Sequence, residues 1–203
     1  AVYDSYCASK NRVIDLFEGY PVIDALSDFE FYEKGQIAMP IPAITAAYPF
    51  LEQDLPMRWV YYCCAQHDKV SNRFLSMPGR RTEIIGVQLY KYAIDGFLQW
   101  GYNFYYSASS WHIVNPFVDV SGDNWVPAPN GTAYRSLHGM QFAEALQDQR
   151  LLELCESLVG RDATMALVND GVEGEMTFHD YPRTDEYLLT LKDRVIDTIK
   201  ENI

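Results

Sequence analysis

The chain has 203 residues, 48% of them hydrophobic and 22% charged, with a formal net charge of −12. This size and apolar fraction are typical of a single globular domain spanning residues 1–203, and they exclude an intrinsically disordered chain. A surface this acidic repels phosphates, so we expect no nucleic-acid partner and no anionic membrane, whereas a neutral glycan is not opposed.

The first part of the chain predicts one helix and three strands. Residues 4–18 are polar with apolar punctuation and predict the helix. Residues 21–26 are typical of a short buried strand, residues 36–43 of a second, and residues 58–64 of a third with almost no polar interruption. Continuous apolar runs are typical of parallel strands that are covered on both faces.

A further helix, a fourth strand and a long loop follow. The helix begins at Pro78-Gly79, and its apolar residues fall on one face at helical spacing. The strand is predicted at residues 96–103, and the loop at residues 105–134 is rich in Ser, Asn, Asp, Gly and Pro. A loop of this length in a compact domain is usually functional or disordered. The face of the helix consists of Ile84, Ile85, Gln88, Leu89 and Tyr92.

Two long helices close the chain. The first covers residues 136–158 and is stopped by Gly160, and the second is capped by Thr184. The predicted inward residues are Phe142, Leu146, Leu151, Leu154, Cys155 and Leu158 in the first helix, and Leu188, Leu191, Val195 and Ile199 in the second. Strands that alternate with helices predict an α/β fold with a parallel sheet, and four βα units fall short of the eight that close a barrel.

No motif for nucleotide, phosphate or metal chemistry is present. The chain contains no GxGxxG, GxxxxGK[ST], GxSxG or HExxH sequence, and its four cysteines and four histidines lack ligand spacing. We therefore expect neither a cofactor nor a metal. The longest apolar stretch, residues 37–51, contains three prolines and is too short to cross a membrane. Unpaired cysteines and the lack of a visible signal segment favour a cytoplasmic location.

Residues 96–106 combine a strand with an aromatic, amide-bearing surface. Phe97 and Leu98 suit a covered strand. Gly101 lets a ligand approach the backbone, and Asn103 offers hydrogen bonds among tyrosines. This mixture suits a sugar, which has apolar C–H faces and many hydroxyls. An aromatic-rich core strand followed by a loop has the same appearance, so both interpretations stay open.

Carboxylates follow the predicted strands. Asp24 and Asp28 come after the first strand, and Asp123 lies in the long loop. Active sites of α/β barrels lie where strands end and βα loops begin, so Asp24 could bind a hydroxyl or assist an acid. A helix N-cap or a solvated loop acid is the alternative for Asp24 and Asp28.

Six segments together resemble a known family. They are residues 22–28 (VIDALSD), 58–64 (RWVYYCC), 71–74 (SNRF), 86–90 (GVQLY), 96–103 (GFLQWGYN) and 142–148 (FAEALQD). In this order and spacing they are similar to the C-terminal half of the catalytic domain of glycoside hydrolase family 123, a bacterial group. The two tryptophan-containing strands are the specific parts of the resemblance, which covers nearly the whole chain.

The resemblance implies a (β/α)8 TIM barrel, of which this chain would be the C-terminal half with about four βα units. It also implies hydrolysis of N-acetyl-β-galactosaminides with retention, by attack of the substrate's own acetamido oxygen on the anomeric carbon. An adjacent Asp-Glu pair serves this reaction: the Asp orients the acetamide, and the Glu protonates the leaving oxygen.

Two departures from the family pattern matter. The family's Asp-Glu pair follows the fourth strand, whereas this chain has Asp185-Glu186 only at the start of its last helix. We therefore expect the pair upstream of Ala1, no catalytic residue within the chain, and no activity of the chain alone. Gly122-Asp123 is kept, but Ser136-Leu137-His138 lacks the arginine of the family's Ser-x-Arg, so the role of that arginine is not filled here.

Residues and resemblance together predict one wall of a sugar site. Trp100 would form an apolar floor, and either Tyr61 or Tyr62 would reach the acetamide or a hydroxyl, because strand alternation lets only one point inward. Asn103, Asp24 and Asp123 would bind hydroxyls, and Trp125 would shield the loop side.

The predicted partners are a carbohydrate substrate and the N-terminal half of the same protein. Two alternatives stay open. One is another retaining hexosaminidase or glycosidase on the same barrel with a different sugar. The other is a non-catalytic glycan-binding or structural half-barrel that assembles with a second chain.

Overall fold

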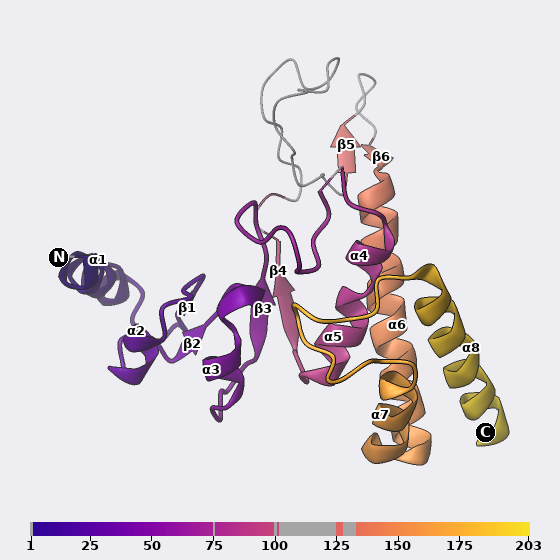
Figure 1. The fold of residues 1–203 in the computed structure, drawn as a ribbon. Coiled ribbons are helices and arrows are strands. Elements are labelled where there is room, and N and C mark those ends of the chain that lie inside the picture. Colours follow the sequence, from indigo (N-terminus) through magenta and orange to yellow (C-terminus); the bar gives the residue numbers. More distant parts are fainter. Residues whose placement is uncertain (1, 75, 100, 102–124, 128–132) are drawn as a thin grey trace. The chain divides into compact units, whose positions relative to one another are not determined.

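The structure is a computed structural model that describes residues 2–74, 76–99, 101, 125–127 and 133–203. The chain forms two compact units, which are described separately below (Figure 1). The first, called the strand unit, comprises residues 1–61 and 95–98. The second, called the helical unit, comprises residues 62–94 and 99–203.

The strand unit contains one long helix and several short elements. Its helices are α1 (Val2–Leu16), α2 (Phe29–Glu33), the 3-10 turn η1 (Ile44–Ala46) and α3 (Tyr48–Leu51). Its strands are β1 (Ile23–Asp24), β2 (Met39–Pro40), β3 (Trp59–Tyr61) and β4 (Gly96–Leu98). All four predicted strands are therefore confirmed, although each is shorter than its predicted run.

These strands pair in parallel and in the order of the sequence. Asp24 on β1 lies opposite Pro40 on β2, and Tyr61 on β3 lies opposite Leu98 on β4. A parallel bridge between Ala43 and Tyr61 links the two pairs beyond the end of β2. The result is a mixed α/β arrangement with parallel strand pairs, which agrees with the predicted class.

Two features of the first strands differ from the sequence prediction. β2 is only two residues long, because Pro40 and Pro42 have no N–H to donate to a neighbouring strand. Ile23 was expected in a buried strand but is 47% exposed. Among the described strands β1 pairs with β2 alone, so one side of β1 has no neighbouring strand to help cover its side chains.

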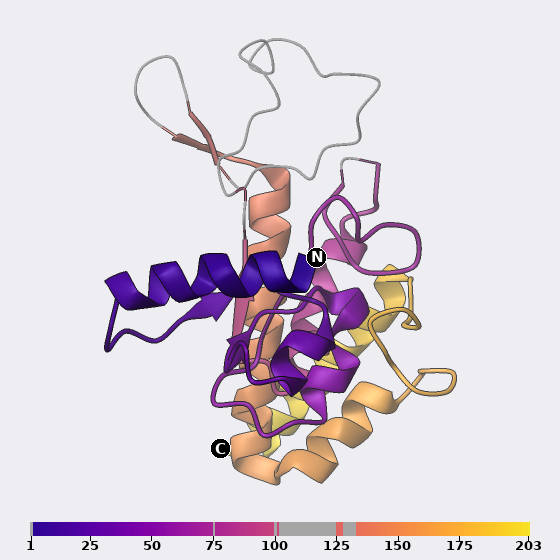
Figure 2. The ribbon, with the colours of Figure 1, turned by 90° about the vertical axis from the view of Figure 1, so that its left-hand side faces the viewer.

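The interior of the strand unit combines aliphatic side chains with the buried rings of Phe31 and Phe50. Phe31 packs its ring 4.9 Å from those of Tyr3 and Tyr6 on α1. Phe29 meets the fully buried Phe50 edge-on at 5.1 Å. The predicted helix at the start of the chain is confirmed as α1, which turns back into β1 (Figure 2). No residue of α1 is itself buried.

In its described residues, the helical unit contains five helices and a hairpin. The helices are α4 (Arg80–Glu83), α5 (Ile85–Lys91), α6 (Leu137–Val159), α7 (Arg161–Asn169) and α8 (Asp185–Glu201). The hairpin pairs β5 (Trp125–Pro127) with β6 (Ala133–Arg135) in antiparallel fashion. This hairpin was not expected, because the whole of residues 105–134 was predicted to be a loop.

The helix predicted after Pro78-Gly79 is present but divided. Ile84 ends α4 and precedes α5. Ile85 to Tyr90 are all buried, so α5 is covered on every side rather than on the one face that the spacing predicted. Its small residue Gly86 allows this: a Cβ there would lie 1.8 Å from the carbonyl oxygen of Ala145 on α6. α5 and α6 therefore pack in direct backbone contact.

The long helix α6 is confirmed at both ends, and its predicted inward face is confirmed in part, at Cys155. The Ser136 side chain accepts a hydrogen bond from the N–H of Gly139 at 3.0 Å, and Gly160 ends the helix with φ of 86°. The buried residues are Ala145, Asp148, Leu152 and Cys155. Of the predicted inward residues, Leu154 and Leu158 are exposed. Leucines occur on several faces of this helix, so the sequence pattern did not define its inner face.

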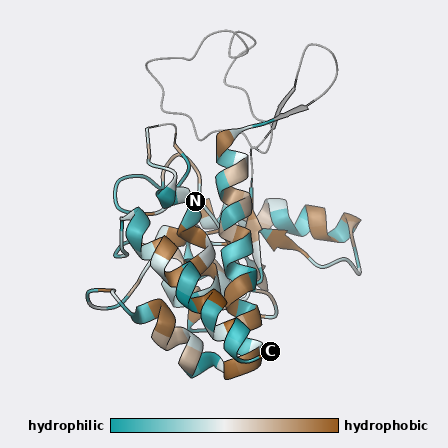
Figure 3. Ribbon diagram, turned by 90° about the vertical axis from the view of Figure 1, so that its right-hand side faces the viewer, coloured by the Kyte–Doolittle hydropathy of each residue, from teal (hydrophilic) through white to brown (hydrophobic). Residues whose placement is uncertain are grey.

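The last three segments complete the core of the helical unit. α7 was not predicted. Residues 172–184, called the strap, join α7 to α8 without a helix or strand. The cap at Thr184 and the apolar face of α8 are confirmed, since Leu188, Leu191, Val195 and Ile199 are all buried. They pack in one cluster with residues from α5, α6, α7 and the strap. Hydrophilic and hydrophobic residues are interspersed along the helices (Figure 3).

Candidate functional site

The carboxyl ends of the parallel strands form one candidate site in the strand unit. Ser27 Oγ accepts a hydrogen bond from the N–H of Ala43 at 2.9 Å, Ala43 bridges to Tyr61, and Tyr61 lies opposite Leu98. These residues form a row across the edge where β3 and β4 end. Ligands of parallel sheets bind at the carboxyl ends of strands, so this row is a candidate ligand-binding edge.

Asp24 lies at the end of β1 but not in this row. Asp24 pairs with Pro40 on β2. Pro40 comes three positions before Ala43, the residue of that segment that belongs to the row. Its half-buried carboxylate accepts a hydrogen bond from the Tyr6 hydroxyl at 2.7 Å. Burial, and then this hydrogen bond, raise the pKa of Tyr6 well above its ordinary value of 10.0. Tyr6 therefore stays protonated and holds Asp24 from α1.

Asp28 is a structural residue. Its side chain accepts a hydrogen bond from the N–H of Glu30 at 3.1 Å and caps α2. Such a bond satisfies one of the free N–H groups at a helix start. The alternative reading of Asp28 as an N-cap is therefore confirmed.

The two adjacent tyrosines differ in environment. Tyr61, in the strand unit, is half-buried, whereas Tyr62, in the helical unit, is 1% exposed. The Tyr62 ring lies under the Arg73 guanidinium, with 5.6 Å from the carbon of that group to the ring centroid. Burial raises the pKa of Tyr62 to about 12, while the Arg73 charge opposes the rise. Tyr61 is the more accessible of the two, and its contact with a sugar stays a prediction.

The other predicted site residues cannot be placed. Trp100, Asn103 and Asp123 lie outside the described residues, and Trp125 is described only as part of the backbone of β5. Asp185 and Glu186 occupy the first turn of α8. That the catalytic pair lies elsewhere stays a prediction.

The segment after β3, residues 62–74, is a second candidate region, here called the β3 loop. Its backbone is held by its own side chains in the helical unit. Asn72 Nδ2 donates to the carbonyl oxygen of Cys63 at 2.9 Å and also to that of Gln66. Gln66 Oε1 accepts the N–H of Cys63 at 2.9 Å. The side-chain amides of Asn72 and Gln66 therefore fix the backbone of the loop.

Sequence reasoning assigned no role to the buried polar residues of this region. Ser71, Asn72 and Arg73 are fully buried, as are Thr82 and Gln88. A fully buried arginine is unusual, because a charge removed from water must be compensated. The signal was present in two places: the SNRF segment belongs to the family resemblance, and Gln88 interrupts the apolar face of a predicted helix.

The described residues contain no group of three or more His, Cys, Asp or Glu side chains that could hold a metal ion. In the same part of the chain, no helix has both the length and the apolar character needed to span a membrane. All four cysteines are free thiols.

Parallel strands with polar groups at their carboxyl ends are a common frame for α/β enzymes. In a comparison with known protein families, the family model for "Glycoside hydrolase 123, catalytic domain" matches residues 2–155. The chain therefore belongs to this family, which points to glycoside hydrolase activity and a carbohydrate substrate. A comparison with curated proteins found no significant match.

Proposed function

We propose that this chain is the C-terminal half of a (β/α)8 catalytic barrel that hydrolyses N-acetyl-β-galactosaminides with retention of configuration. The observation that carries the proposal is the family match over residues 2–155. The sequential, parallel order of β1 to β4 supports it, because neighbouring strands of such a barrel follow one another in sequence and run parallel.

Open surfaces of the strand unit support the assignment as a half-barrel. Among the described strands, β1 and β4 each have one paired neighbour. Unpaired strand edges and clustered apolar side chains are usually covered in a native protein. On α1 and just after it, Leu16 is 79% and Phe17 55% exposed. The N-terminal half of the same protein would cover these groups, and the strand and helical units would then belong to one barrel domain.

The reaction would begin with attack of the substrate's acetamido oxygen on the anomeric carbon. The bond to the leaving oxygen breaks, and a glutamic acid donates its proton to that oxygen. A neighbouring aspartate orients the acetamide and balances the positive charge that develops on it. Water then opens the cyclic intermediate and restores the β-anomer. In our proposal the Asp-Glu pair lies upstream of residue 1, and the reaction uses no metal or cofactor.

This chain would supply one wall of the sugar site. Tyr61, at the carboxyl end of β3, would reach the acetamide or a hydroxyl, and Trp100 would support the apolar face of the ring. Asp24, held by Tyr6, would accept a hydroxyl hydrogen bond. Asn103 and Asp123 would bind further hydroxyls, with Trp125 shielding the loop side.

A pair of matched substrates tests the mechanism in the complete protein. An aryl N-acetyl-β-galactosaminide should be hydrolysed, whereas the aryl β-galactoside, which lacks the acetamide, should not. The first product should be the β-anomer by NMR. Equal turnover of both substrates would refute substrate assistance. Sugar binding without any turnover would assign the protein to glycan binding instead.

A further inference from the structure

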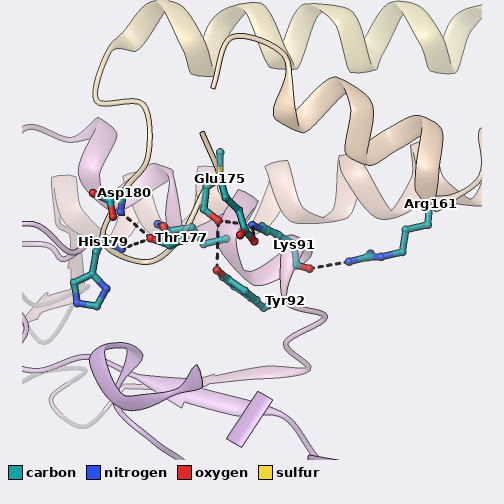
Figure 4. Close-up of polar contacts among 9 residues, drawn as sticks. Lys91, Tyr92, Arg161, Glu175, Thr177, His179 and Asp180 are labelled. Atoms are coloured by element: carbon teal, nitrogen blue, oxygen red, sulfur yellow. Dashed lines mark hydrogen bonds and ion pairs between the residues drawn. The ribbon is translucent and has the colours of Figure 1, made fainter. Parts of the chain in front are cut away.

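The strap, residues 172–184, is anchored deep in the helical unit although it lies outside the part of the chain that matches the family. Met176 and Phe178 are fully buried, and the Phe178 ring stacks on Tyr92 at 4.8 Å. Lys91 Nζ donates to Glu175 Oε1 at 2.8 Å and to the carbonyl oxygen of Met176 (Figure 4). The strap is thus fixed to α5 along its first half.

A tight turn fixes the middle of the strap. Thr177 N–H donates to the carbonyl oxygen of Asp180 at 2.7 Å. Thr177 Oγ1 accepts the N–H groups of His179 and Asp180 at 3.1 and 2.9 Å (Figure 4). With its amide and hydroxyl engaged in this turn, Thr177 presents its carbonyl oxygen to α5.

Gln88 connects this carbonyl to the β3 loop. Its Nε2 donates to the carbonyl oxygen of Thr177 at 2.9 Å, and its Oε1 accepts from Ser71 Oγ at 2.9 Å. Gln88 and Ser71 are both fully buried. A side-chain amide can donate at one end and accept at the other, so a single residue joins two segments that are 106 positions apart, from 71 to 177.

Two arginines, Arg81 and Arg183, form further hydrogen bonds that connect the β3 loop to the strap. Arg81 donates to the carbonyl oxygen of Val70 at 2.6 Å and to the Tyr181 hydroxyl at 3.1 Å. Arg183 Nη2 donates to the carbonyl oxygen of Lys69 at 3.0 Å. Arg81 also donates to the carbonyl oxygen of Asp68. Four consecutive residues of the β3 loop, 68 to 71, are therefore tied to the strap, three of them through side chains of α4 or α5.

We propose that the strap positions the β3 loop for the reaction, and that Gln88 is the positioning residue that transmits this order. The proposal rests on the proposed function, because the loop continues directly from Tyr61, the residue proposed to reach the sugar. A displacement of about 1 Å in a group that aligns substrate can cost about 100-fold in rate.

The test compares two substitutions of α5 residues in the complete protein. Gln88→Met keeps the bulk of the side chain and removes both hydrogen bonds of the bridge. Lys91→Met is the matched control, because it removes the Lys91 contacts with Glu175 and Met176 and leaves the bridge and the buried Met176 and Phe178 in place. Ser71→Ala, a smaller change on the loop side of the bridge, serves if Gln88→Met does not fold.

Two readouts separate positioning from general stability. Hydrogen–deuterium exchange of residues 62–74 should rise in Gln88→Met and Ser71→Ala at temperatures where the protein is folded, and should stay near the wild-type level in Lys91→Met. For an aryl N-acetyl-β-galactosaminide, kcat/KM should fall about tenfold or more with Gln88→Met, and less with Lys91→Met.

Unchanged exchange of the loop in both bridge variants would overturn the proposal. Raised exchange with wild-type kcat/KM would overturn it as well, because the order would then have no effect on the reaction. If the wild-type protein shows no hydrolysis, the proposed function fails, and the exchange experiment alone decides whether the strap holds the loop.

Discussion

Gly86 sets the distance between two helices of the helical unit. A Cβ at this position would lie 1.8 Å from the carbonyl oxygen of Ala145, and both residues sit inside helices, α5 and α6. Backbone atoms of a helix cannot shift without moving the whole element. By contrast, a Cβ at Gly79 would meet only the amide end of the Gln141 side chain, which can rotate away.

Gly86→Ala should therefore destabilise the protein by about 1–3 kcal/mol or more, since overpacking forces backbone shifts. Gly79→Ala, with the same added methyl group and a helical φ of −55°, should change the free energy of unfolding far less. Denaturant unfolding of both variants measures the difference. Equal effects would mean that α5 and α6 do not pack this closely.

The neighbours Tyr61 and Tyr62 offer a second contrast between single residues. Tyr61→Phe should lower kcat/KM about two- to tenfold, the effect of losing one hydrogen bond to substrate, and leave the melting temperature nearly unchanged. Tyr62→Phe keeps the ring against Arg73 and should leave kinetics near the wild type. Kinetics and melts on both variants test this. A kinetic defect confined to Tyr62→Phe would place the wrong tyrosine in the site.

Among the elements, α8 forms ion pairs with α4 and α6 through Lys192. Lys192 Nζ lies 2.9 Å from Asp148 on α6, 3.5 Å from Glu83 on α4 and 3.6 Å from Glu144 on α6. Burial, and then the charge of Asp148, raise the pKa of Glu83 above its ordinary value of 4.5. Burial likewise raises the pKa of Asp148 despite its contact with Lys192. One cation here faces three acids.

The raised pKa of Glu83 has a defined consequence for stability. The folded protein binds the Glu83 proton more tightly than the unfolded chain does. The stability that this proton contributes is therefore fully present below the ordinary pKa of 4.5. It is lost as the pH rises through the raised value. The difference in free energy of unfolding, Glu83→Gln minus wild type, should therefore be more positive at pH 7 than at pH 4.

Denaturant unfolding at the two pH values measures this shift. Glu144→Gln is the control, because this acid is 61% exposed and a surface pair contributes about 0–1 kcal/mol. A Glu83→Gln variant whose difference from the wild type is the same at pH 4 and pH 7 would contradict the account of this cluster.

At the level of elements, the sequence predicted well wherever local signals were strong. Thr184 and Ser136 marked helix starts, and the apolar runs located all four parallel strands. The sequence failed where distant packing decides the outcome. α5 is buried on all sides because Gly86 admits α6, and Leu154 and Leu158 face outward because the inner face of α6 is set by its partners rather than by its leucines.

For the molecule as a whole, the family could be predicted and the site only in part. The strands ending at Asp24 and Tyr61 were located by their apolar patterns, and the resemblance carried the function. The buried network of Ser71, Asn72 and Gln88 was not predicted, because its partners lie far apart in sequence and include the carbonyl oxygen of Thr177. No residue pattern reports a backbone carbonyl at such a distance.

The central claim is that this chain contributes one half of a catalytic barrel whose acid lies elsewhere in the protein. The most direct measurement compares residues 1–203 with the complete reading frame on an aryl N-acetyl-β-galactosaminide. We predict turnover by the complete protein and none by the chain alone, since loss of a general acid typically costs about 10²–10⁴-fold. Turnover by the chain alone at the rate of the complete protein would contradict the account, as would a complete protein that hydrolyses no N-acetyl-β-hexosaminide.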